Sequence, residues 1–109
     1  MYKLRVPDHL IALVRGLHPE LKWKIRGSLK NIAADPNAGK PLKDELEGLR
    51  SFRVSRFRII YRIAVRKEIQ LIAIGPRERI YEETYRLIRK DSKGRKRVDM
   101  KTTRKERTE

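Results

Sequence analysis

The chain has 109 residues, enough for one small domain, and 39% of them are charged, with a formal net charge of +15. It contains no cysteine and only two histidines, which excludes disulfides, thiolate nucleophiles and cysteine zinc sites, and we expect neither a metal nor a cofactor. So large a positive charge attracts polyanions, among which nucleic acid comes first, ahead of an acidic protein and an anionic membrane.

The excess of positive charge lies mostly in the body of the chain. Residues 1–90 carry 21 basic and 10 acidic side chains (net +11), and residues 91–109 carry 8 and 4 (net +4). The second stretch is nearly free of large apolar residues and cannot bury enough surface to order itself. The sequence therefore predicts a folded domain over 1–90 and a basic, disordered tail over 91–109.

No segment has the features of a membrane anchor or a secretion signal. No apolar run approaches the roughly 20 residues that span a bilayer, and the N-terminus lacks the apolar centre of a signal peptide. We expect a cytoplasmic protein without a membrane partner.

The first half of the chain alternates between strand and helix signals. Residues 2–6 alternate as a short strand, and residues 8–17 place their leucines and Val14 at helical spacing. His18-Pro19-Glu20 is typical of a helix start, and this second helix should reach about residue 34. We expect the two helices to pair, with Trp23 filling a gap between them. Residues 35–48 are rich in Pro, Gly, Asn and Asp and should form a loop.

Three strands are expected next, over about 49–55, 56–66 and 68–75, joined by turns short enough to make them antiparallel. The last strand is continuously apolar, which is typical of a central strand covered on both faces. A short helix should follow over residues 80–90. The result is an α+β fold of order β-α-α-β-β-β-α, a small antiparallel sheet with the helix pair packed on one face.

Residues 50–67 hold seven basic side chains within one hairpin. Successive side chains of a strand point to opposite faces. One parity is apolar and should enter the core: Phe57, Ile59, Tyr61, Ile63 and Val65. The other parity carries an arginine row, which should lie on the open face of the sheet and attract RNA: Arg56, Arg58, Arg62 and Arg66.

Two motifs are similar to those of a known group of proteins. The first is KPLKDELEGLRSFRVSRFRIIYRI, in which a leucine-rich loop end precedes a basic strand and an aromatic-Arg-x-x-Tyr strand. The second is IGPRERIYEE, with Gly-x-Arg-x-Arg after the last strand. With these motifs in this order, the chain from Tyr2 to about Lys90 resembles the RelE/ParE toxin superfamily of type II toxin–antitoxin systems, which shares the expected element order.

The resemblance implies two kinds of activity. RelE-like members are ribonucleases that cleave messenger RNA, many of them in the ribosomal decoding site. ParE-like members share the fold and are thought to poison DNA gyrase without cutting RNA. Both kinds are inhibited by an antitoxin. The implied partners are a RelB-like antitoxin, messenger RNA and the ribosome, with operator DNA reached only through the antitoxin complex.

The resemblance also implies the site residues. The arginine of the aromatic-Arg-x-x-Tyr strand is Arg58, and the arginine after the glycine is Arg77. A basic pair of the family falls on Ser51 and Arg53, of which only the second is basic. An ungapped match puts the family tyrosine at Glu83, so Tyr81 and Tyr85 both remain candidates, and we prefer Tyr81. The candidate catalytic residues are thus Arg53, Arg58, Arg77 and Tyr81, and the candidate RNA- or phosphate-binding residues are Arg50, Ser51, Arg56, Arg79 and Tyr85.

The chemistry of RNA cleavage suits these residue types. RNA carries its own nucleophile, the 2′-hydroxyl, so positioning and charge stabilisation can act without a metal. Arginine forks bind phosphate oxygens, and a tyrosine among guanidinium groups should have a lowered pKa and serve as a base. We favour a metal-independent endoribonuclease that inhibits translation. A non-catalytic gyrase poison and a degenerate toxin that only binds its antitoxin remain the alternatives.

Overall fold

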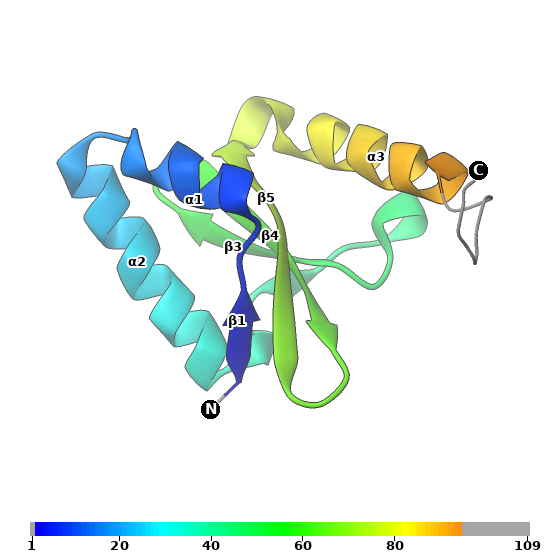
Figure 1. Cartoon of the computed structure of the whole chain (residues 1–109), viewed down its shortest axis with the longest axis horizontal. Coiled ribbons are helices and arrows are strands. Elements are labelled where there is room, and N and C mark those ends of the chain that lie inside the picture. The colour runs from blue at the N-terminus through cyan, green and yellow to red at the C-terminus, as the bar shows by residue number, and fades with distance from the viewer. Residues whose placement is uncertain (1, 95–109) are drawn as a thin grey trace.

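The computed structural model describes residues 2–94 and has an α+β fold with a five-stranded sheet, which confirms the expected class (Figure 1). The elements occur in the expected order, with one further two-residue strand, β2, inside the predicted loop. Two 3₁₀ turns, η1 (Pro36–Ala38) and η2 (Asp44–Leu46), flank β2. The helices and strands are β1 (Lys3–Arg5), α1 (Asp8–Arg15), α2 (Pro19–Ala34), β2 (Lys40–Pro41), β3 (Arg50–Val54), β4 (Phe57–Ala64), β5 (Glu68–Pro76) and α3 (Arg77–Gly94).

The strands lie in the order β1-β5-β4-β3-β2, so the apolar strand β5 is internal, as expected. The pairs β2–β3, β3–β4 and β4–β5 are antiparallel. The pair β1–β5 is parallel, with Lys3 opposite Glu68. The sheet is therefore mostly antiparallel, and the exception is the strand that two helices separate from the rest, since a parallel neighbour needs a long crossover.

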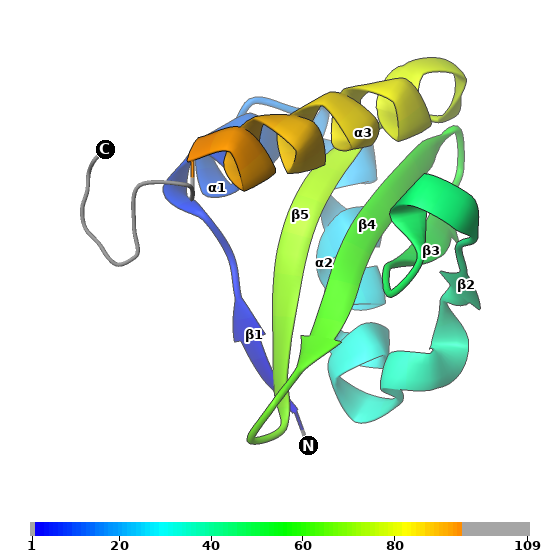
Figure 2. The ribbon, with the colours of Figure 1, turned by 90° about the vertical axis from the view of Figure 1, so that its right-hand side faces the viewer.

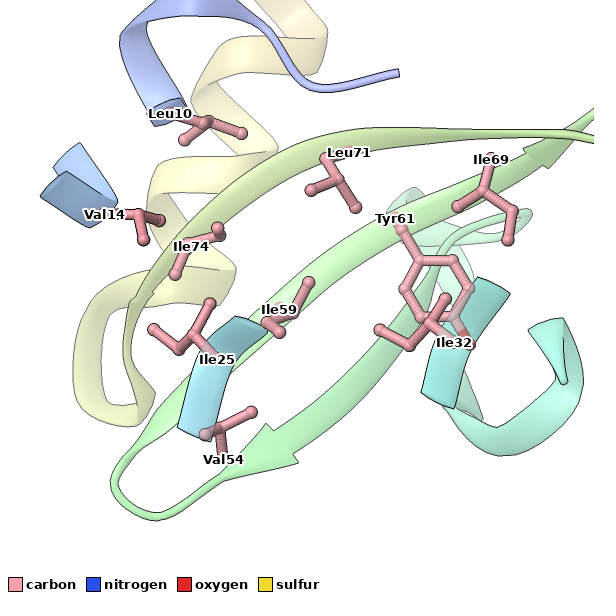
Figure 3. Close-up of a cluster of buried hydrophobic side chains, with 10 residues drawn as sticks. All are labelled: Leu10, Val14, Ile25, Ile32, Val54, Ile59, Tyr61, Ile69, Leu71 and Ile74. Carbon is pink, nitrogen blue, oxygen red and sulfur yellow. The ribbon is translucent and has the colours of Figure 1, made fainter. Parts of the chain in front are cut away.

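Helices α1 and α2 cover one face of the sheet (Figure 1). The nitrogen Nδ1 of His18 accepts a hydrogen bond from the backbone N–H of Glu20 at 3.3 Å, which caps the start of α2. Apolar side chains at helical spacing on α1 and α2 meet odd-numbered side chains of β4 in the main core. Figure 3 shows the buried residues of this core: Leu10, Val14, Ile25, Ile32, Val54, Ile59, Tyr61, Ile69, Leu71 and Ile74.

Two apolar side chains that the sequence suggests for the interior lie outside it. Trp23 does not fill a gap between the helices: it is 80% exposed on α2. Its position on the helix surface is far from that of Ile25, which faces the core, because successive residues of a helix differ by about 100°. Val65 is also 80% exposed, because β4 ends at Ala64 and Val65 belongs to the following turn.

The second face of the sheet is not the open arginine row that the sequence suggests. Helix α3 crosses this face at the upper ends of β4 and β5 (Figure 2). A second, smaller core lies beneath it, formed by Leu49, Ile60, Ala73 and Ile80. Ile60 has the same parity as Arg58 and is fully buried, and its burial requires this cover. Arg56 and Arg66 lie in turns, so only Arg58 and Arg62 of the predicted row are on the strand itself.

Helix α3 is longer than the sequence suggests. It begins at Arg77, directly after β5, and continues to Gly94, four residues past the predicted domain boundary. The rest of the predicted tail, residues 95–109, lies outside the described residues. Within residues 2–94, no helix combines the length and apolar composition needed to cross a membrane.

Candidate active site

A group of polar side chains gathers where α3 starts against β3 and β4. In the sheet register, Arg53 of β3 lies opposite Arg58 of β4, and Gly75 of β5 lies on the other side of Arg58. All three positions belong to the sheet face that α3 covers. Gly75 has no side chain, and a Cβ there would come within 3.0 Å of Ile80. The glycine therefore lets α3 approach the sheet closely beside Arg58.

The start of α3 brings Arg77 and Tyr81 to the same place. The backbone N–H of Arg77 donates a hydrogen bond to the carbonyl of Arg56 at 2.8 Å, which fixes the first turn of α3 on the β3–β4 turn. Tyr81 lies four residues later, on the same side of the helix. Ile80, only 1% exposed, holds this turn in the smaller core. Two strands and one helix therefore fix the position of the Tyr81 ring.

The phenol of Tyr81 lies in a basic environment. Its hydroxyl and the Ser51 hydroxyl are 3.0 Å apart and share a hydrogen bond. Burial alone raises the pKa of Tyr81, but interactions with Ser51, Arg58 and the positive charge of Arg77 outweigh it and lower that pKa from its ordinary value of about 10. The site thus favours the phenolate form of Tyr81.

Arg58 is the most constrained of these arginines. It is partly buried, and its Nη1 atom is inaccessible to solvent and makes no hydrogen bond. The two ion pairs within residues 2–94 join Arg5 to Glu68 and Arg86 to Glu82, so Arg58 and Arg77 have no acidic partner there. A buried donor without a partner is costly, and an anion beside Arg58 would satisfy it. The arrangement can accept an anionic group such as a phosphate between two cations and a phenol.

Four of the other candidate residues do not join this group. Arg50 has the opposite parity and donates hydrogen bonds to the backbone carbonyls of Gly39 (2.9 Å) and Asn37 (3.2 Å), so it holds the loop before β2. Arg56 and Arg79 are exposed, and neither is among the groups that shift the pKa of Tyr81. Tyr85 is partly buried, with the guanidinium of Arg89 5.6 Å from its ring centre.

Two features of the site have roles that the sequence does not reveal. Ser51 is buried, and its hydroxyl shares a hydrogen bond with the Tyr81 hydroxyl. The sequence indicates only that Ser51 stands at a position where the family has a basic residue. Gly75 makes room beside Arg58. The alternation in β3 indicates only that Ser51 and Arg53 share a face, and the contact of Ser51 with Tyr81 of α3 has no local signal. For the part of the chain that the structure describes, no group of three His, Asp or Glu side chains is placed to hold a metal ion.

Comparison with protein families gives one match over most of the domain. The family described as the ParE toxin of the type II toxin–antitoxin system parDE matches residues 8–81. This match includes Arg58, Arg77 and Tyr81. No match was found among curated proteins.

Toxins and toxin–antitoxin complexes are among the solved structures with the same fold. The RelBE2 toxin–antitoxin complex from Mycobacterium tuberculosis is 24% identical, covers 70% of this chain and 98% of that chain, and has a TM-score of 0.62. The isolated E. coli RelE toxin is 19% identical, with 81% and 99% covered and a TM-score of 0.60. A double arginine-to-alanine mutant of E. coli RelE in the free state is 19% identical, with 83% and 96% covered and a TM-score of 0.63. At these identities the likeness establishes the fold, which is that of RelE.

Proposed function

Since the chain belongs to the ParE toxin family of type II toxin–antitoxin systems and has the RelE/ParE fold, we propose that it is a toxin that cleaves messenger RNA without a metal. One observation carries this proposal. Arg58 and Arg77 both act on the phenol of Tyr81, and Arg58 keeps a buried donor without a partner. A scissile phosphate beside Arg58 would supply the missing acceptor and place an RNA 2′-hydroxyl near a tyrosine whose pKa is lowered.

The cleavage step needs only groups that the site contains. The Tyr81 phenolate takes the proton of the 2′-hydroxyl, the 2′-oxygen forms a bond to phosphorus, and the bond from phosphorus to the 5′-oxygen breaks. Arg58 and Arg77 hold the non-bridging oxygens, whose charge grows in the transition state. The departing 5′-oxygen takes a proton from water, and the exposed Arg77 guanidinium stabilises its charge as a cation. The products are a 2′,3′-cyclic phosphate and a free 5′-hydroxyl.

A defined substrate tests this step. The full-length protein is mixed with translating ribosomes and a short message, and the 3′ ends of the fragments are identified by mass spectrometry. We expect 2′,3′-cyclic phosphate ends, and we expect a single 2′-deoxy nucleotide on the 5′ side of the cleaved bond to stop cleavage there. Cleavage that continues at the deoxy position would exclude the 2′-hydroxyl as nucleophile.

A second candidate function is action on DNA gyrase without RNA cleavage. The family that matches is named for ParE, and Ser51 stands where the RelE pattern has a basic residue. Incubation of the protein with purified gyrase and supercoiled plasmid separates the two functions. Gyrase-dependent double-strand breaks, together with intact messages in the ribosome experiment, would favour this candidate.

An antitoxin is the partner proposed with either function, and the solved RelBE2 complex named above contains one. A groove of about 380 Å³ between α1, β5 and α3 suits an apolar segment of such a partner. Leu13 and Leu87 line it and are 39% and 40% exposed. Changing both to Asp should stop co-purification with the product of the neighbouring reading frame, and Val65→Asp, in an exposed turn, should not. Normal co-purification of the double variant would exclude the groove as the antitoxin-binding site.

A further inference from the structure

The outer face of α2 combines an exposed aromatic ring with positive charge. Trp23 is 80% exposed, the largest exposed fraction among the large apolar side chains of residues 2–94 together with Val65. Arg26 follows it by three residues and Lys30 by seven, so all three share one side of the helix, and all are exposed. Lys24 lies at the margin of this strip. We refer to Trp23, Arg26, Gly27 and Lys30 as the Trp23 face.

Gly27 has no packing function among the described residues, 2–94. It lies inside α2, one turn after Trp23, where glycine lowers helix stability relative to alanine. A Cβ at Gly27 would meet nothing within 4 Å, so no neighbouring atom requires a glycine. Gly27 is exposed, and because it has no side chain it leaves the backbone of α2 open to close approach by another molecule.

The Trp23 face and the candidate active site lie on opposite sides of the protein. Helix α2 packs with Ile25 and Ile32 against the sheet face that carries Tyr61 and Ile59. Arg58 and Ser51 have the other parity and face α3. In Figure 1, α2 and α3 lie on opposite sides of the strands. The Trp23 face therefore cannot contribute to the Tyr81 site.

We propose that the Trp23 face is a second RNA-binding surface, which takes a single-stranded or looped segment of RNA. An unstacked base would lie on the indole ring of Trp23, and Arg26 and Lys30 would bind the flanking phosphates. An aromatic platform beside cations fits a strand that offers both flat bases and negative charge. The choice of RNA among single-stranded polyanions rests on the proposed function, whereas the surface itself does not.

Tryptophan fluorescence gives a direct test, because Trp23 is the only tryptophan of the chain. The full-length protein with Arg58→Ala and Arg77→Ala is titrated with an uncleaved uridine oligonucleotide, with the matching thymidine oligonucleotide, and with heparin, a polyanion without bases. We expect the RNA to quench the emission on binding and to bind more tightly than the DNA, and heparin to bind without comparable quenching. These variants keep the test independent of cleavage.

Variants of the Trp23 face separate stacking from charge. Trp23→Ala, followed by fluorescence anisotropy of a labelled RNA, should lower RNA affinity by about tenfold and leave heparin affinity unchanged. Arg26→Gln with Lys30→Gln should reduce the slope of log affinity against log salt by about 1.4, because each phosphate that is no longer neutralised lowers it by about 0.7. The matched control, Arg66→Gln with Lys67→Gln, removes the same charge at the exposed β4–β5 turn and should leave Trp23 quenching unchanged. Circular dichroism checks that each variant is folded.

Three results would overturn the proposal. RNA binding that leaves the emission unchanged, with wild-type affinity in Trp23→Ala, would exclude the surface. Tighter binding of the thymidine oligonucleotide would exclude RNA as its ligand. Equal quenching by heparin would indicate a face that binds polyanions through charge alone.

Discussion

The hydroxyl of Ser51 and the charges of Arg58 and Arg77 act on the Tyr81 phenol in the same direction. Each of them favours the phenolate, and together they lower the pKa of Tyr81 against the opposing effect of burial. A base with a lowered pKa is ionised in a larger fraction of molecules near neutral pH. Because the folded-state pKa is the lower one, this ionisation contributes stability that is fully present above about pH 10, the unfolded value, and is lost as the pH falls through the folded-state pKa.

Ser51→Ala should raise the pKa of Tyr81, because the variant lacks one of the hydrogen bonds that favour the phenolate. The titration of Tyr81 is measured by near-ultraviolet absorbance as the difference from Tyr81→Phe, and cleavage is measured over the same pH range. Both curves should move to higher pH, and cleavage at neutral pH should fall by up to about tenfold. Ser28→Ala, which removes a hydrogen bond within α2, is the control. An unmoved absorbance curve would show that Ser51 does not set the ionisation of Tyr81.

Arg58 should cost stability as well as provide function. Its Nη1 atom is buried without a partner, and replacing such a group by an apolar one of similar shape removes the desolvation cost. We expect Arg58→Met to abolish cleavage and to raise the free energy of unfolding by up to about 1 kcal/mol, measured by urea denaturation without polyanions. Arg62→Met, an exposed arginine bonded to Gln70, should stay within about 0.5 kcal/mol of wild type. A loss of stability in Arg58→Met would assign Arg58 to the support of the fold.

At the level of elements, the loop before β2 is held by a side chain of β4. The Tyr61 hydroxyl donates to the Pro36 carbonyl at 2.6 Å and accepts from the Gly39 N–H at 2.9 Å. Burial raises the pKa of Tyr61, so its hydroxyl keeps the proton that it donates. A side chain at Gly39 would overlap this hydroxyl. The tyrosine of the aromatic-Arg-x-x-Tyr motif is therefore structural.

Tyr61→Phe should destabilise the protein by about 1–3 kcal/mol, because two buried backbone groups at Pro36 and Gly39 would be left without their partner. Urea denaturation measures the change. Tyr85→Phe is the matched control, and we expect a change within about 0.5 kcal/mol. Cleavage by folded Tyr61→Phe should match wild type, since its ring lies on the sheet face opposite to Arg58. Reduced cleavage by fully folded Tyr61→Phe would mean that Tyr61 contributes to the active site.

Local patterns predict most of the elements, and non-local contacts account for the rest. The alternation of β4 and the apolar run of β5 place both strands, since each pattern reports burial directly. The parallel pairing of β1 with β5 brings together residues 65 positions apart, such as Lys3 and Glu68. A local sequence pattern cannot predict such a contact. The large apolar side chain of Trp23 suggests a place in the core. Its position on the helix relative to the buried Ile25 and Ile32 indicates the surface, where it lies.

The candidate site divides in the same way. The resemblance supplies Arg58, Arg77 and Tyr81, which the structure brings together. Arg50 is grouped with them in the sequence because it is close by, although its parity in β3 differs from that of Ser51. The part of Ser51 in orienting Tyr81 depends on where α3 meets β3, and only the assembled fold contains that information.

At the scale of the whole molecule, basic side chains gather on two separate surfaces of residues 2–94. One side carries Arg58 and Arg77 around the Tyr81 phenol, and the other carries the Trp23 face. The helices and the sheet between them keep these surfaces apart, and a single polyanion would have to pass around the domain to reach both. The cleavage proposal depends on the first surface alone.

Primer extension on translated messages tests the central claim most directly, with full-length wild type, Arg58→Ala and Arg77→Ala compared at equal concentration. Arg66→Ala, at the exposed β4–β5 turn, is the control, and thermal unfolding confirms that each variant is folded. We predict discrete cleavage sites with wild type and Arg66→Ala, and cleavage reduced about a hundredfold or more in each of the other two variants. Cleavage near the wild-type level in both folded variants would contradict the account.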